Sequence, residues 1–145
     1  MNLGEFLGLF KQGKVSAKSH MKNLIEMAMV DGSFDDGEKN LLNKIAKKYG
    51  VSRKQLDDIS LNKDSIQFVM PENEDEKFKQ LYELVTMMLA DDLVHSDEMN
   101  LCEIFAKRFE YPAEKVRELI ESIVSNIKYG QSIKETKQRV HWLLT

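Results

Sequence analysis

A repeat with a constant offset of sixty residues is the feature that most limits how this chain can fold. The stretch DGSFDDGEKNLLNKIAKKY at residues 31–49 returns at residues 91–109 as DDLVHSDEMNLCEIFAKRF, and six of the nineteen positions are identical. The same offset relates apolar residues on both sides, over residues 21–59 and 81–119. A gapless match of this length predicts two copies of one helix–loop–helix–helix unit.

Apolar side chains recur at helical spacing along the chain, and runs that alternate as in β-strands are lacking. With 145 residues, 42% apolar residues and only two prolines, the composition suits one helical domain with a sizeable core. We therefore expect an all-α fold in which residues 1–145 form one compact bundle of about seven helices. The expected core residues share apolar helical stripes: Leu41, Ile45, Leu84, Leu101, Phe105, Ile120 and Val124.

Capping residues predict where several helices begin. Ser16 is expected to cap a helix that runs to about Val30. Capping boxes, in which a serine pairs with Gln or Glu three residues later, are expected at Ser52 and Ser132. Pro112 is expected in the first turn of a later helix, where its missing N–H costs nothing.

The ends of the chain and its single cysteine predict a cytoplasmic protein. Residues 1–15 have apolar positions that suit a small amphipathic arm, which we expect to dock on the domain or on a partner rather than on a membrane. The start has the wrong charge order for a secretory signal, and no apolar run is long enough to span a membrane. Cys102 has no partner for a disulfide within the chain. A net charge of −3 argues against binding to nucleic acid.

Acidic side chains occupy equivalent positions in the two repeats and predict a cation site. Asp31 and Asp91 are expected to close a helix at its C-terminal end, where the helix dipole disfavours a carboxylate. Glu38 and Glu98 follow seven residues later, in the first turn of the next helix. Clustered oxygen ligands suit Ca²⁺ or Mg²⁺, so we predict that Asp31 with Glu38, and Asp91 with Glu98, form partly exposed acidic pairs that bind one of these ions. Three nearby residues are additional candidate ligands: Asp35, Asp92 and His95.

Capping chemistry is the alternative explanation for the same residues. Glu38 can complete a capping box with Asp35, and Asp31 can belong to a simple turn. The loop that begins at Asp31 is not an EF-hand. Counted from Asp31, its sixth position is Asp36 rather than Gly, and its twelfth is Leu42 rather than Glu. The Glu-x-x-His pairs of di-iron bundles and the usual nucleotide-binding and hydrolase motifs are also missing from the sequence. We therefore expect no catalytic residues and no cofactor other than the cation.

The first acidic loop and its helices resemble the tellurite-resistance TerB-like family. The pattern there is a helix ending in Ala-x-x-Asp-Gly, a short loop, and then a Glu in a helix with Leu and Ala following. The matching residues in this sequence are Ala28, Asp31, Gly32, Glu38, Leu41 and Ala46. The second unit departs from the pattern, because Met88 replaces the Ala and Asp92 replaces the Gly. The resemblance covers residues 21–127.

This resemblance implies an all-helical, non-enzymatic domain whose acidic loops bind a divalent metal, with a role in tellurite resistance or another stress response. Similar domains also occur at the cytoplasmic amino-terminal side of a membrane-anchored DnaJ-type co-chaperone, although this chain lacks the His-Pro-Asp motif of a J-domain. Two functions therefore stay open. One is an ion-binding regulatory domain, and the other is a metal-free interaction module that recruits a protein partner or a second copy of the chain.

Overall fold

Seven α-helices and two short 3-10 helices make up the described part of the chain, which contains no strand. The computed structural model describes residues 3–29, 36–90 and 96–144, with side chains from residue 16 onward. The helices are α1 (Leu3–Met29), α2 (Asp36–Lys48), α3 (Arg53–Leu61), η1 (Lys63–Ser65), α4 (Glu74–Met88), α5 (Ser96–Arg108), α6 (Val116–Lys128), α7 (Ile133–Val140) and η2 (His141–Leu143). The all-α prediction is confirmed.

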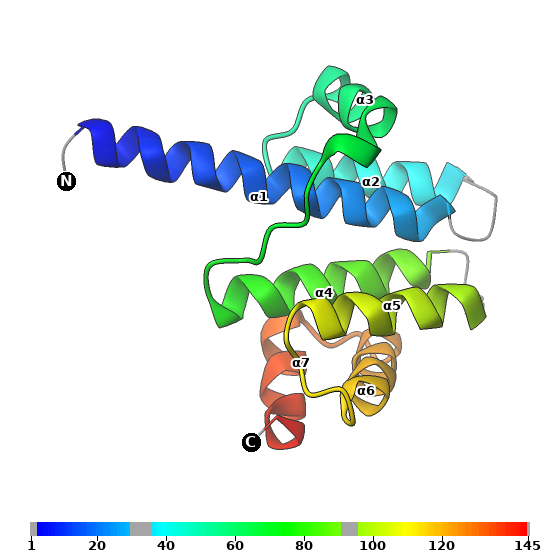
Figure 1. Cartoon of the computed structure of the whole chain (residues 1–145). Coiled ribbons are helices and arrows are strands. Elements are labelled where there is room, and N and C mark those ends of the chain that lie inside the picture. Colours follow the sequence, from blue (N-terminus) through cyan, green and yellow to red (C-terminus); the bar gives the residue numbers. More distant parts are fainter. Residues whose placement is uncertain (1–2, 30–35, 91–95, 145) are drawn as a thin grey trace.

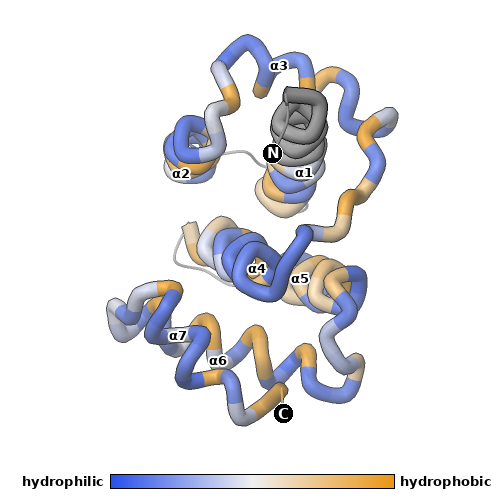
Figure 2. The backbone as a smooth tube through the Cα atoms, turned by 90° about the vertical axis from the view of Figure 1, so that its left-hand side faces the viewer, coloured by the Kyte–Doolittle hydropathy of each residue, from blue (hydrophilic) through white to orange (hydrophobic). Residues whose placement is uncertain are grey.

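The long helices pack in three layers (Figures 1 and 2). Helices α1 and α2 form the first layer, α4 and α5 the second, and α6 and α7 the third, while α3 lies across the outer side of α1 and α2. Helix α4 contacts α1, α2, α5, α6 and α7. It is therefore buried on most of its surface, and its buried side chains are Phe78, Gln80, Leu81, Glu83, Leu84, Val85, Met87 and Met88.

The connector between the two halves is fastened along α1. The backbone N–H of Val69 donates to the Ser19 hydroxyl at 2.9 Å, and the Lys22 amine donates to the Ile66 carbonyl at 2.7 Å. The ring of Phe68 packs against that of Phe109 at the end of α5, with ring centroids 5.6 Å apart. These contacts fix the connector between α1 and α5. They help to hold α1 beside α4, where His20 contacts Glu83.

Local sequence signals set several helix ends as predicted. Complete capping boxes begin α3 and α7 at Ser52 and Ser132. Gly50 follows α2 with a φ of 71°, and the N–H of Val51 reaches back to the Ala46 carbonyl at 2.8 Å. This bond closes a Schellman motif, in which a left-handed residue ends the helix and satisfies its last carbonyls.

Two predicted helix starts were wrong. Ser16 lies inside α1, which is helical from Leu3 and so includes the stretch expected to form an arm; the Ser16 hydroxyl accepts a bond from Gln80 at 3.4 Å instead of capping. Pro112 lies in a turn closed by the Lys115 N–H at 2.9 Å, and α6 begins only at Val116. In the first place the helix continues on the N-terminal side of Ser16, and in the second a turn separates Pro112 from the helix.

The core prediction was correct for four of its seven residues. Ile45, Leu84, Phe105 and Ile120 are buried. Leu41, Leu101 and Val124 are only half-buried and pack against the edge of the core. The two leucines are equivalent in the repeat, and each precedes a buried residue, Leu42 or Cys102, so both leucines lie at the edge of the buried stripe of their helix.

Helices α2 and α5 have the same length and are offset by sixty residues, as the repeat requires. The helices that follow them differ, because α3 has nine residues and α6 has thirteen. Superposition of the two whole units is therefore still a prediction. No helix in the described ranges combines the length and apolar character needed to cross a membrane.

Candidate functional site

Two of the predicted cation ligands, Glu38 and Glu98, lie in equivalent buried positions. Each stands in the first turn of its helix, α2 or α5, and each residue is only 3% exposed. Both helices begin at the same end of the bundle, on the right in Figure 1. The expectation of partly exposed carboxylates was wrong for both, because the first turn of each helix packs against the bundle.

The other predicted ligands lie outside the described residues, so the structure does not test whether the acidic side chains come together. These are Asp31, Asp35, Asp91, Asp92 and His95. Within the described ranges, no three His, Cys, Asp or Glu side chains are grouped so as to hold a metal ion. The four-carboxylate site therefore stays a prediction, with two of its members placed at one end of the bundle.

A second group of polar side chains surrounds Glu83 in the interface between α1 and α4. His20 Nε2 lies 3.1 Å from Glu83 Oε1, the Tyr49 hydroxyl donates to the same oxygen at 2.7 Å, and Lys48 Nζ donates to Oε2 at 2.9 Å. His20 is 0% exposed and Glu83 is 4% exposed. We call these four residues the Glu83 cluster. The cluster joins α1 and the end of α2 to α4.

The environment of Glu83 keeps its carboxylate ionised. Burial alone raises the pKa of this group, but the hydrogen bond and charge of His20, together with the bonds from Lys48 and Tyr49, lower it further than burial raises it. The balance lowers the pKa of Glu83 from 4.5 to about 2. A buried carboxylate with three donors is a satisfied ion, whereas one without them would strongly destabilise the fold.

Tyr49 keeps its proton and so complements the ionised Glu83 carboxylate. Burial, followed by the charge and hydrogen bond of Glu83, raises the pKa of the Tyr49 phenol above its ordinary value. The hydroxyl therefore stays protonated as a donor, and it also lies 3.3 Å from Glu76 Oε1. Lys79 Nζ lies 4.8 Å from the centre of the Tyr49 ring, which adds a cation–π contact. The cluster thus suits fixing helices in register rather than transferring protons.

The single cysteine is not a candidate nucleophile. Cys102 is 0% exposed on α5. Burial, followed by the nearby charges of Glu103 and Glu98, raises the pKa of the thiol above its ordinary value. A buried protonated thiol packs as a small apolar group, as expected from its place in the apolar stripe.

Sequence reasoning missed the Glu83 cluster. His20 and Glu83 are 63 positions apart, so no local spacing joins them. The usable signal was a polar residue inside a stripe of core positions. His20 precedes the buried Met21, and Glu83 precedes the buried Leu84. Polar residues at such positions need partners across the helix interface, although the sequence does not say which.

The chain was compared with models of protein families, with curated proteins and with solved structures, and none of the three comparisons finds a match.

Proposed function

We propose that this chain is a non-enzymatic, TerB-like domain that binds a divalent cation, Ca²⁺ or Mg²⁺, through its two acidic loops in a stress-response role. The supporting observation is the paired burial of Glu38 and Glu98 in the first turns of α2 and α5, at one end of the bundle. Carboxylates in a site of low dielectric constant attract a cation more strongly than exposed ones do.

The proposed ligands follow from this placement. Glu38 and Glu98 supply oxygens from fixed helix turns, and Asp31 and Asp91 supply oxygens from the loops before them. Hard oxygen ligands fit Ca²⁺ and Mg²⁺ better than the softer transition metals. The bound ion would neutralise the carboxylates and stabilise the loops, which makes the domain a sensor of the ion rather than a catalyst.

Thermal melting with and without millimolar Ca²⁺ or Mg²⁺ tests the proposal. An ion that binds only the folded state stabilises it by about 2.7 kcal/mol at a hundredfold excess over its Kd. The double variant Asp31→Asn/Glu38→Gln should lose this gain. A matched control is Asp57→Asn/Asp58→Asn, which removes the same charge from exposed positions on α3 and should keep the gain. An unchanged wild-type melting temperature with both ions would reject the cation proposal.

A metal-free interaction module is the second candidate, and the length of α1 favours it. Helix α1 has 27 residues, and its N-terminal part extends beyond the other helices (Figure 1). A helix that extends from a bundle offers a surface for a protein partner or a second copy. Removing residues 1–15 should abolish self-association, measured by sedimentation, if this part of α1 joins two copies. An unchanged sedimentation profile would reject the second-copy form of this candidate.

A further inference from the structure

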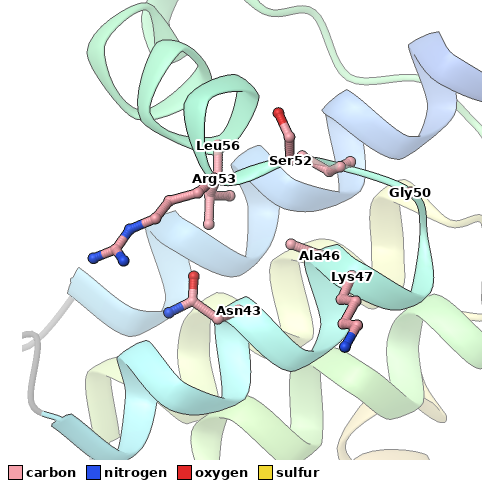
Figure 3. A pocket seen from close by; sticks show the side chains of 8 residues that line it. Asn43, Ala46, Lys47, Gly50, Ser52, Arg53 and Leu56 are labelled. Carbon is pink, nitrogen blue, oxygen red and sulfur yellow. The ribbon is translucent and has the colours of Figure 1, made fainter.

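A hollow of about 550 Å³ lies between the C-terminal end of α2 and the start of α3 (Figure 3). This volume is in the range of sites that hold small molecules, about 300–1,000 Å³. Ala46, Val51 and Leu56 supply its apolar lining, and Asn43, Lys47 and Arg53 are among its polar residues. The lining thus carries two cations and no carboxylate.

Arg53 differs from the other arginine near the start of a helix in its charge partners. It forms no ion pair with any described residue, although Asp57 stands one helical turn later on α3. Arg117 on α6 shows the contrasting case. Its guanidinium lies 3.0 Å from Glu121, one turn later, and 3.3 Å from Glu103. Among the described residues, Arg117 thus has two acidic partners, whereas Arg53 lines a hollow without an ion pair.

Arg53 and Asn43 lie on the same side of the hollow. In Figure 3 the Arg53 guanidinium extends from α3 toward the side where the Asn43 carboxamide rises from α2, while the Lys47 amine points away from Arg53. The Ser52 hydroxyl is already used, since it accepts the Gln55 N–H at 3.1 Å. Arg53 and Asn43 are thus the donors left to a ligand, with Lys47 adding positive potential at the edge.

We propose that this hollow binds a small organic oxyanion, a carboxylate or a phosphate ester, with Arg53 as its main donor. A guanidinium offers two parallel N–H groups that match the two oxygens of such a group. Asn43 donates a further bond from its carboxamide. The apolar part of the ligand lies on Ala46, Val51 and Leu56. The site is separate from the acidic loops, so it does not depend on the cation proposal.

Amide NMR spectra of the full chain test this site, with sodium butyrate and inorganic phosphate as probes at constant ionic strength. We expect saturable shifts of the Gly50, Ser52 and Arg53 amides and of the Asn43 side-chain amide. Stronger binding of butyrate would assign the site to carboxylates with an apolar body, and stronger binding of phosphate would assign it to phosphate esters. Absence of saturation by either probe at tens of millimolar would overturn the proposal.

Two variants make the result specific. Arg53→Gln should weaken probe binding by about tenfold or more, because it removes the charge and the paired N–H groups. Arg53 is exposed and outside the Ser52–Gln55 capping box, so this variant keeps the fold. Arg117→Gln removes the same charge from α6 and should bind the probes as the wild type does. Equal binding by the wild type and Arg53→Gln would show that the shifts come from general screening, and it would also overturn the proposal.

Discussion

Gly50 and Glu110 share the same left-handed backbone conformation, with φ of 71° and 66°, at positions sixty residues apart. Each ends its helix through the same two hydrogen bonds. The N–H of residue 50 or 110 bonds the carbonyl of Lys47 or Lys107, and the next N–H bonds that of Ala46 or Ala106. The α2 and α5 helices therefore end in one motif, although only the first has the glycine that this conformation favours.

Replacing Glu110 by Gly should stabilise the protein by about 0.5–1 kcal/mol, because a residue with a Cβ is strained in this conformation and Gly is not. The reciprocal Gly50→Ala should cost about 1 kcal/mol, and open space around Gly50 means that this cost is conformational rather than steric. Unfolding in urea measures the change in the free energy of unfolding for both variants. Glu110→Gln is the control for charge and should behave as the wild type. A loss of stability in Glu110→Gly would contradict this account.

The sequence predicted features that depend on neighbours along the chain. The α2 and α5 helices and the capping boxes at Ser52 and Ser132 all follow from residues within a few positions of one another. Helical periodicity and capping are local effects, which a single sequence contains in full.

Features that depend on distant contacts were not predictable in the same way. Ser16 was expected to cap a helix, whereas its hydroxyl accepts a bond from Gln80 on α4, and the Glu83 cluster was missed because its members come from three segments. The burial of Glu38 and Glu98 was also misjudged, since the sequence places a residue on a helix turn without showing what packs over that turn.

Phe105 is fully buried, as its apolar stripe predicts, and it should be a major contributor to stability. Phe105→Ala should lower the free energy of unfolding by about 3–5 kcal/mol, through lost apolar burial and the cavity left behind. Ile104, the preceding residue on α5, is 45% exposed and provides the control. Ile104→Ala should cost clearly less, and similar losses in the two variants would mean that Phe105 is poorly packed.

Tyr49→Phe removes the hydroxyl that donates to Glu83 at 2.7 Å and leaves the ring in place. The buried carboxylate then lacks one donor, so the variant should lose about 1–3 kcal/mol of stability. Tyr129→Phe is the matched control, because Tyr129 is 81% exposed, and it should be neutral. Chemical denaturation of the two variants decides the point. Equal stability of Tyr49→Phe and the wild type would show that water or another donor replaces the hydroxyl.

Glu83 should make the fold sensitive to acid in a defined range. Its pKa is lowered from 4.5 to about 2 in the folded protein. A lowered pKa means that the folded state favours the ionised form, so the stabilisation is complete above pH 4.5 and is lost as the pH falls toward 2. A shift of this size corresponds to about 3 kcal/mol, as an order of magnitude.

Unfolding free energies measured in urea at successive pH values, for the wild type and Glu83→Gln, test this prediction. The glutamine has nearly the same shape but carries no charge, so it loses the ionic part of the contacts with His20 and Lys48. The wild type should be more stable than the variant at neutral pH, and the difference should shrink between pH 4.5 and 2 as Glu83 itself becomes neutral. Glu114→Gln is the control, because it removes the same charge from an exposed position before α6 and outside every capping box, so this variant should follow the acid dependence of the wild type far more closely. A difference between the wild type and Glu83→Gln that stays constant through this range would mean that Glu83 acts through its shape and hydrogen bonds, and that its charge contributes nothing to holding α1 and α2 against α4.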